Sequence, residues 1–394
     1  MMYAVLSNPN HPKYGVATIP FPIPRDQYTY CMDLLEALEV GDTVKADCKV
    51  VEFDSVYTVL KRMKALTVNV EELNYLVKRL ESFDTGEAAQ FQAMAHKLEL
   101  FELKDLINLT FCCQQATVIT DFSDLAAVGR DHYMNLHGSS AKTEELDALD
   151  GKETARQLIE SGSGTVTPYG VVYDNGMKLE QVYDGRFFPC YYYKPNAITV
   201  AVTSKAEPED TEHITWMFLP MVQEEIDRAL LRGGITDSAD VRLRLEDSQL
   251  PNEVDVLLDM EYETLSDLNE LAEATDGLPK ADMEKLGAVV MLAKPKSAAQ
   301  IKNLAESLDL FDLAPGAHTP QEYGKYMIQQ SGRFEYDENL DAFYDYERYG
   351  TERMNAEDGM FTDRGYIAYK GYISMEEVMN GGQSNHMVLG GLSR

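Results

Sequence analysis

The chain has 394 residues, of which 44% are hydrophobic and 10% aromatic, so its composition excludes a disordered acidic tail. Its length predicts two or more domains. The 66 acidic and 35 basic residues give a formal net charge of −31, which excludes a surface that attracts nucleic acid or anionic lipid and favours a basic partner.

The first residues, MMYAVLSNPNHPKYG, predict no signal peptide, because they lack a basic region followed by an apolar one. No window of the chain is apolar for long enough to span a membrane. The five cysteines form no CxxC pair and are odd in number, which indicates reduced, structural thiols. Together these features predict a cytoplasmic protein.

The first half is predicted to open with strands over Tyr3–Ile19, followed by a short helix over Gln27–Leu38. The alternating stretch KADCKVVEF predicts the next strand. A helical block follows, and its fourth helix is expected to open at Ser123, with Leu125 and Ala127. The run GVVYD predicts a closing strand, so this half mixes strands and helices.

The second half is predicted to follow the same order. Strands over Ile198–Phe218 precede a helix over Gln223–Leu231 and the strand DVRLRLED. Four helices are then expected near Leu265–Ala274, Lys280–Leu292, Ala298–Ser307 and Pro320–Gln330. The last of these places proline at the first helical position after Thr319, and the run GYIAY predicts the closing strand.

These parallels extend to individual residues and predict an internal duplication. LTVNVEELNYLVKRLES, which begins at Leu66, lies 195 positions before EYETLSDLNELAEATDG, which begins at Glu261. In this register Asn69 matches Thr264 and Glu72 matches Asp267, the N-cap and third position of a helix start. Downstream, LDALDGKETARQ parallels LDAFYDYERYGT.

The fold class expected from these elements is α+β, with three small lobes in each half. The first half covers 1–195, divided near 1–65, 66–138 and 139–195. The second covers 196–394, divided near 196–263, 264–331 and 332–394. The first half has 28 acids and 18 bases, a net of −10, whereas the second has 38 acids and 17 bases, a net of −21. The second half therefore carries most of the net charge.

The sequence offers no pattern typical of an enzyme, so we predict no catalytic residue, no metal site and no cofactor. The seven histidines are scattered outside HExxH or any similar ligand spacing. A GxSxG nucleophile elbow and a GxxxxGK[ST] phosphate loop are both missing. Paired carboxylates are so frequent that they single out no catalytic pair, and the acid-rich segments have few bases to hold the phosphates of a nuclease substrate.

The acids of the second half recur at regular, solvent-facing positions, which makes them candidates for binding a basic partner. Duplex DNA carries one charge per roughly 1.7 Å, so 31 charges at that density would cover about 50 Å. The alternative interpretation is a solvated, solubilising face. The candidates are Asp255, Asp259, Glu261, Glu263, Asp267, Glu270, Glu273, Asp276, Glu335, Asp337, Glu338, Asp341, Asp345, Glu347, Glu352, Glu357, Asp358 and Asp363.

The stretch LDAFYDYERYG, residues 340–350, interleaves aromatic rings with acids. A tyrosine buries a large ring and keeps a hydroxyl for solvent or a partner. We therefore expect Phe343, Tyr346 and Tyr349 to form the core of a small lobe whose surface carries carboxylates.

These residues resemble the C-terminal motif of the ArdA family of antirestriction proteins, acidic mimics of B-form DNA. EYETLSDLNELAEA is similar to that family's linker into its helical middle domain, and RLRLEDSQLP to the strand before it. The resemblance covers about Ile198–Tyr369. The motif positions are Leu340, Phe343, Asp345, Tyr346, Tyr349 and Gly350.

The resemblance implies two tandem ArdA-like halves in an elongated chain, each with small mixed lobes around a helical middle domain. In the first half the motif is expected to have decayed, with Gly151 and Lys152 at the positions of Asp345 and Tyr346. Family members are usually a single unit that forms a dimer, so the halves are expected to form a pseudo-dimer within one chain. A homodimer through the second half is also compatible with the resemblance.

The function that the resemblance implies is inhibition of a host-defence complex on behalf of a mobile genetic element. The expected partner is the basic DNA-binding groove of a type I restriction-modification complex, without direct nucleic-acid or membrane binding. Three alternatives stay open: another DNA-reading target such as a CRISPR effector, an acidic scaffold or chaperone for a basic protein, and a divergent hydrolase.

Overall fold

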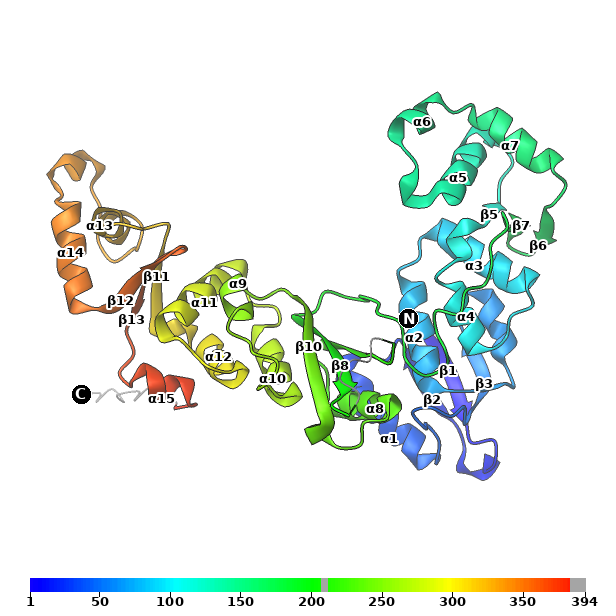
Figure 1. Ribbon diagram of the computed structural model, residues 1–394, viewed down its shortest axis with the longest axis horizontal. Coiled ribbons are helices and arrows are strands. Elements are labelled where there is room, and N and C mark those ends of the chain that lie inside the picture. Colours follow the sequence, from blue (N-terminus) through cyan, green and yellow to red (C-terminus); the bar gives the residue numbers. More distant parts are fainter. Residues whose placement is uncertain (207–211, 383–394) are drawn as a thin grey trace, which may run out of the picture. The chain divides into compact units, whose positions relative to one another are not determined.

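The computed structural model describes residues 1–206 and 212–382, which pack into two compact units (Figure 1). Unit 1 comprises Met1–Lys194, Asp210–Thr215 and Val222–Thr236. Unit 2 comprises Pro195–Glu209, Trp216–Met221 and Asp237–Arg394. Part of the predicted strand range Ile198–Phe218 lies outside the described residues. The helix that the sequence placed early in the second half belongs by its packing to unit 1.

Unit 1 combines two small sheets with helices. Its strands are β1 (Met2–Ser7), β2 (Ala17–Phe21), β3 (Cys48–Asp54), β4 (Thr67–Val68), β5 (Thr117–Ile119), β6 (Thr165–Thr167) and β7 (Gly170–Tyr173). Its α-helices are α1 (Tyr28–Ala37), α2 (Val70–Glu81), α3 (Thr85–Lys97), α4 (Leu103–Leu109), α5 (Leu125–His137), α6 (Thr143–Ala148), α7 (Gly151–Glu160) and α8 (Gln223–Gly233). The strand orders are β2-β1-β3-β4 and β5-β7-β6.

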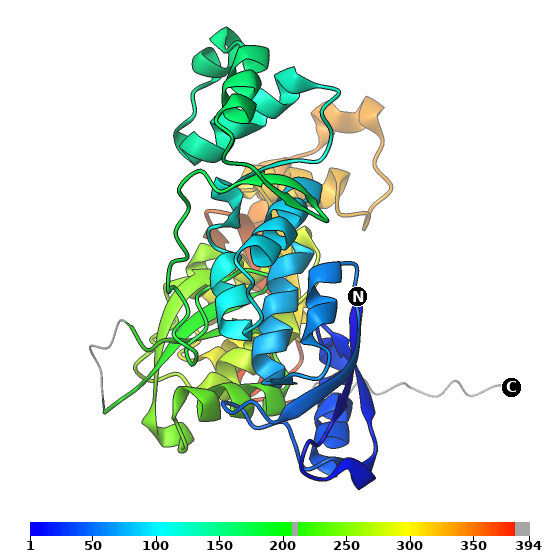
Figure 2. The same ribbon diagram turned by 90° about the vertical axis from the view of Figure 1, so that its right-hand side faces the viewer.

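The core of unit 1 lies between its first sheet and the helices that follow (Figure 2). Met2, Ala4 and Leu6 alternate with more exposed residues along β1, so one face of the strand is buried. Helix α2 buries an apolar stripe that includes Leu73 and Leu80. The sheet and the helix thus share one hydrophobic cluster.

Unit 2 repeats this mixture of small sheets and helices. Its strands are β8 (Ile198–Ser204), β9 (Thr215–Leu219, of which all but Thr215 lie in unit 2), β10 (Val241–Ser248), β11 (Phe311–Pro315), β12 (Asp358–Thr362) and β13 (Gly365–Tyr369). Its α-helices are α9 (Asn252–Asp255), α10 (Leu265–Thr275), α11 (Lys280–Ala293), α12 (Ala298–Ala305), α13 (Pro320–Gln329), α14 (Tyr346–Ala356) and α15 (Met375–Met379). The strand orders are β10-β8-β9 and β11-β13-β12.

The expected α+β class is confirmed, and α10 to α13 lie within two residues of their predicted bounds. The predicted N-cap Thr319 accepts a hydrogen bond from the Glu322 N–H, and Pro320 begins α13. Helix α5 begins at Leu125, two residues after Ser123, and its N-cap is Asp124. Among the described residues, no helix is both long and apolar enough to cross a lipid bilayer.

The two units share several local features at a spacing of 195 residues. Asn69 accepts a hydrogen bond from the Glu72 N–H at the start of α2, as Thr264 does from the Asp267 N–H at the start of α10. The reciprocal bond of a full capping box is not formed at either start. The later strand orders β5-β7-β6 and β11-β13-β12 also correspond. The duplication itself stays a prediction.

One further shared contact connects each of these helices to the chain just after an earlier strand, β2 in unit 1 and β9 in unit 2. The Ile23 N–H donates to Asn74 Oδ1 at 2.9 Å in unit 1, and the Met221 N–H donates to Asn269 Oδ1 at 2.8 Å in unit 2. Each asparagine lies five residues after its helix N-cap. The contact therefore fixes the same register between helix and chain in both units.

Candidate partner-binding surface

The structure exposes most of the acids that the sequence singled out. Their side chains lie on α10, on the segments before it, and on the last lobe between α13 and β13. The exposed candidates are Asp259, Glu261, Glu270, Glu273, Asp276, Glu335, Asp337, Glu338, Asp345, Glu347, Glu352, Asp358 and Asp363. These are the carboxylates that a basic partner could approach.

Three candidates near α10 are half-buried, which corrects the expectation that they face solvent. Both carboxylate oxygens of Glu263 accept the Ala298 N–H at 3.0 Å, at the start of α12, where the helix dipole favours a negative charge. Burial nevertheless raises the pKa of Glu263. Asp267 accepts the Thr264 hydroxyl at 2.7 Å. Glu263 and Asp267 thus accept hydrogen bonds at the starts of α12 and α10, respectively.

Asp255 is the most unfavourably placed of the candidates. Burial raises the pKa of its carboxyl group, against the lowering effect of a hydrogen bond from Ser248. Among the residues that the structure describes, no donor reaches its buried Oδ1. A half-buried carboxylate with an unsatisfied oxygen destabilises the fold and offers little charge to a partner.

A hydrogen-bonded cluster around Asp341 organises the aromatic stretch 340–350. Its Oδ1 accepts the hydroxyl of Tyr336 at 2.7 Å, the hydroxyl of Tyr346 at 2.5 Å and the side-chain amide of Gln329 at 2.8 Å. The Tyr346 and Tyr336 hydroxyls together hold the pKa of Asp341 below its usual value. The cluster joins α13, the 3-10 helix Glu338–Phe343 and α14.

Asp345 and Gly350 have separate structural roles in the motif. Asp345 is the N-cap of α14, and its side chain accepts the Arg348 N–H at 3.0 Å. Gly350 lies buried where α14 meets α13, and a Cβ there would be 1.8 Å from the Pro320 carbonyl oxygen. Gly324 on α13 is equally confined, with 2.0 Å from its Cβ position to the Tyr346 carbonyl oxygen. The helices therefore cross in backbone contact.

The expectation that Phe343 belongs to the core is wrong. Its side chain is 84% exposed and that of Leu340 is 47% exposed, because the 3-10 helix directs both outward. Tyr349 does pack against the core of the lobe and makes an edge contact with Phe334, and Tyr346 is half-buried in the Asp341 cluster. Two exposed apolar side chains, those of Leu340 and Phe343, thus lie in the same stretch of chain as the exposed carboxylates of Asp345 and Glu347.

Glu357 is the fifth half-buried candidate. Its carboxylate accepts the Tyr323 hydroxyl at 2.6 Å and forms an ion pair with Arg353 one turn before it. Tyr323 itself packs in the core of the lobe against Tyr366. Glu357 therefore holds α14 to α13 instead of facing a partner.

The structure corrects the alignment of the motif in unit 1. Asp150 is the N-cap of α7 and accepts the Glu153 N–H, so it, and not Gly151, occupies the position of Asp345. Gly129 matches Gly324, since its Cβ position lies 1.9 Å from the Gly151 carbonyl oxygen, the residue that follows the N-cap. The aspartate is thus retained, whereas Ala155 stands in place of Gly350.

The sequence interpretation missed Tyr336, Gln329 and Gly324. Gly324 had a detectable signal, because a glycine in the middle of a helical pattern often marks a close helix contact. Tyr336 and Gln329 had none, since their shared acceptor Asp341 is brought to them by the turn between α13 and α14.

The comparison with known families adds a decisive observation. Residues 211–368 match the family model described as Antirestriction protein (ArdA). This region belongs to the ArdA family. The match includes α10, α13, α14 and the complete 340–350 motif, and thus most of the exposed acids. The search of curated proteins found no match to this chain.

ArdA is a family of inhibitor proteins that act against restriction-modification complexes, and its members imitate DNA. In the part of the chain that the structure describes, no three His, Cys, Asp or Glu side chains are grouped so as to hold a metal ion. Cys48 and Cys113 are buried, and burial raises the pKa of both thiols, which keeps them protonated and unreactive. Both cysteines lie outside residues 211–368, the region that matches the ArdA model.

Proposed function

We propose that this protein is an acidic DNA mimic that occupies the DNA-binding groove of a type I restriction-modification complex in the cytoplasm. The observation that carries the proposal is the coincidence of the ArdA region with the exposed carboxylates of unit 2. A groove that binds DNA is lined with lysine and arginine, which attract carboxylates as they attract phosphates. The protein acts by binding alone, without catalysis, metal or cofactor, and does not itself bind nucleic acid.

We further propose that the two halves form a pseudo-dimer within one chain. The repeated helix caps, the repeated asparagine contacts and the matching sheet orders support this proposal. The exposed Leu340 and Phe343 of the motif also support association of two chains through the last lobe of unit 2.

A competition experiment tests the proposed function. Purified protein is added to a type I restriction-modification complex bound to fluorescent cognate DNA, at several salt concentrations. We expect displacement at near-stoichiometric protein, weakening as salt rises, because the contacts are between distributed charges. A variant with Glu335, Asp337, Glu338, Glu347, Glu352 and Asp358 changed to lysine is expected to lose displacement while remaining folded.

Failure of the wild-type protein to displace DNA from an active complex would overturn the proposal. A second contradictory result is displacement that the lysine variant retains in full. In that case the acids of the last lobe would not carry the binding.

A further inference from the structure

Arg364 connects three parts of unit 2 through one guanidinium group. Its Nε donates to Glu253 Oε1 and its Nη2 to Glu253 Oε2, both at 2.8 Å, so this pair is bidentate. Its Nη1 pairs with the carboxylate of Glu284. Glu253 lies on α9, Glu284 on α11, and Arg364 in the turn between β12 and β13. These three segments belong to the three predicted lobes of unit 2.

The surroundings of Arg364 hold its side chain in this position. Thr362 Oγ1 accepts the Arg364 N–H at 3.2 Å and donates to the Gly365 carbonyl at 2.9 Å, which fixes the turn. On α11, a Cβ at Gly287 would lie 2.4 Å from Arg364 Nε, so the glycine makes room for the guanidinium group. The side chains of Arg364 and Glu253 are 22% and 21% exposed. The hydrogen bonds from Arg364 hold the pKa of Glu253 below its usual value, so the pair stays ionised.

The equivalent turn of unit 1, between β6 and β7, makes a neutral contact. Thr167 Oγ1 accepts the Tyr169 N–H at 3.1 Å, so this turn is closed by a threonine in the same way. At the spacing of 195 residues Tyr169 stands in place of Arg364, and Thr58 in place of Glu253. The Thr58 hydroxyl donates to the Tyr169 hydroxyl at 3.0 Å. The two units therefore join the same two positions, but with an ion pair in unit 2 and without charge in unit 1.

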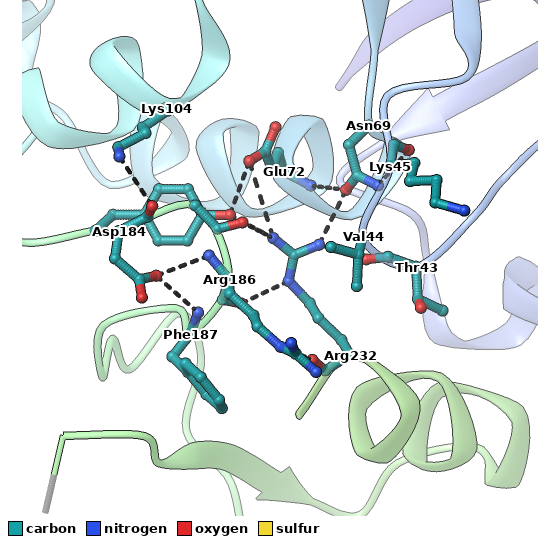
Figure 3. Close-up of polar contacts among 12 residues, drawn as sticks. Thr43, Val44, Lys45, Asn69, Glu72, Lys104, Asp184, Arg186, Phe187 and Arg232 are labelled. Carbon is teal, nitrogen blue, oxygen red and sulfur yellow. Dashed lines mark hydrogen bonds and ion pairs between the residues drawn. The ribbon is translucent and has the colours of Figure 1, made fainter. Parts of the chain in front are cut away.

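Unit 1 has a buried arginine at a different place. Arg232 of α8 is 4% exposed, and its guanidinium group donates to the Thr43 carbonyl and the Tyr183 hydroxyl (Figure 3). The Asn69 side chain accepts a further hydrogen bond at 3.2 Å, and the Glu72 carboxylate lies 3.8 Å away. These partners lie before α2, at its start and after β7. Each unit thus joins distant segments of its chain through one shielded arginine.

The segments that Arg364 joins carry exposed acids of unit 2. Asp259 and Glu261 follow α9, and the acids from Glu335 to Asp358 lie on the last lobe. The last lobe has a hydrophobic cluster of its own, which includes Tyr366. Its position relative to α9 therefore depends on the contacts where α9, α11 and the β12–β13 turn meet. A molecule that already has its binding conformation loses less entropy when it binds.

We propose that Arg364 is a positioning residue, which fixes α9, α11 and the last lobe relative to one another so that carboxylates of different lobes meet the target's DNA-binding groove together. This inference rests on the proposed function and goes further, because it assigns the spacing of the acids to residues outside the candidate surface. Three observations support it: the bidentate pair, its shielding from solvent, and the glycine opposite the guanidinium group.

Replacement of Arg364 with a matched control tests the proposal in the DNA-displacement assay. The test variant is Arg364→Gln. The control is Arg333→Gln, which removes an arginine that pairs with Asp312 of β11, in the same sheet as β12 and β13. Both variants become more negative by one charge, which by itself strengthens attraction to a basic groove. We nevertheless expect Arg364→Gln to need at least about tenfold more protein for half displacement, because the lobes are no longer held in place before binding. The control should stay within about twofold of the wild type.

A distance measurement on the protein alone separates positioning from stability. Spin labels are attached to cysteines placed at Ser238 and Asn355, exposed positions on the first and last predicted lobes of unit 2. The background carries Cys190→Ser, since the other four native cysteines are buried. Circular dichroism verifies that each variant is folded. We expect a narrow distribution of label distances with Arg364 present and in the Arg333→Gln control, and a broader one in folded Arg364→Gln.

The outcomes separate this inference from the proposed function. Equal displacement by Arg364→Gln and Arg333→Gln, or an unchanged distance distribution in Arg364→Gln, would overturn the inference while the proposed function stands. A wild type that displaces nothing contradicts the proposed function, and the distance measurement still tests the positioning. If Arg364→Gln does not fold, Arg364→Lys decides, because it keeps the charge but not the two parallel hydrogen bonds. It should change both readouts in the same direction by less, and wild-type values in both would overturn the inference.

Discussion

Units 1 and 2 use the acids of equivalent helices in opposite ways. In unit 1 Glu71 is bound by Arg228, and Glu72 accepts the Tyr183 hydroxyl at 2.8 Å beside Arg232. In unit 2 Glu270 and Glu273 remain exposed on α10. The acids near the start of α2 thus bind other parts of their own unit, whereas two acids further along α10 have exposed side chains. A count of acids therefore overstates the charge that the protein offers.

The largest effect on this comparison is expected from replacing Arg232, the buried arginine that lies beside the start of α2. Arg232→Ala leaves the Glu72 carboxylate and the surrounding acceptors without their buried cation, and should destabilise unit 1 by about 3–5 kcal/mol. Denaturant unfolding together with hydrogen exchange of α2 measures the loss. Arg232→Lys keeps the charge but cannot reach every acceptor, so it should lose less stability than Arg232→Ala. An Arg232→Ala protein as stable as the wild type would contradict the stabilising role of the Arg232 contacts.

Unit 2 can be destabilised separately at the crossing of α13 and α14. Gly350→Ala places a Cβ 1.8 Å from the Pro320 carbonyl oxygen, so it should cost about 3 kcal/mol in the last lobe. In an exposed helix the same change would stabilise by about 1 kcal/mol, so the sign is diagnostic. Ala155 stands in place of Gly350 in unit 1, so the comparable change there is Gly129→Ala, at the counterpart of Gly324, where a Cβ would lie 1.9 Å from the Gly151 carbonyl oxygen.

Hydrogen exchange assigns each loss to a unit. Gly350→Ala should speed exchange in α13 and α14 only, and Gly129→Ala in α5 and α7 only. A stabilising effect of either substitution would show that the helices are not in backbone contact.

The Asp341 cluster gives a smaller, pH-dependent effect. Its hydrogen bonds hold the pKa of Asp341 below the unfolded value of about 3.9, so they stabilise the lobe above that pH and are lost as the pH falls through the folded value. Asp341→Asn should therefore lower the melting temperature at pH 7 by about 4 °C. The difference should narrow on acidification below about pH 4. A difference that is independent of pH would contradict this account.

The smallest effect is expected at Asp255, whose pKa is raised by burial. The ionised form is disfavoured by folding, so Asp255→Asn should stabilise the protein at pH 7 by no more than about 0.5 kcal/mol. This gain should vanish as the pH falls below the unfolded value of about 3.9. Asp259→Asn, at an exposed position, is the control without a change in stability. Loss of DNA displacement in the Asp255 variant would show that Asp255 does contribute to binding the target.

The sequence predicted those features that depend only on residues close together in the chain, such as the helix caps. Thr264, Asn69 and Thr319 cap their helices as expected because a cap depends only on the residues next to it. The motif 340–350 was located, but its alignment in unit 1 was shifted by one residue, because Asp150 is recognised only by its bond to the Glu153 N–H. The exposure of Phe343 was missed, since alternating aromatics and acids do not reveal a 3-10 helix.

The long-range contacts could not be predicted from sequence patterns. Arg228 and Glu71 are separated by 157 residues, and their pairing depends on how α8 packs in unit 1. The burial of Glu263 likewise follows from the position of α12, 35 residues further along the chain. These contacts decide which acids remain exposed. The set of candidate acids could therefore be reduced only with the structure.

Hydrogen exchange of the protein alone and bound to a type I restriction-modification complex tests the central claim most directly. The account predicts slower exchange on binding in α10 and in residues 335–358, and unchanged exchange in α2, whose acids Glu71 and Glu72 already bind other parts of unit 1. Protection confined to α2 and the rest of unit 1, with α10 unchanged, would contradict the claim that unit 2 presents the carboxylates to the target.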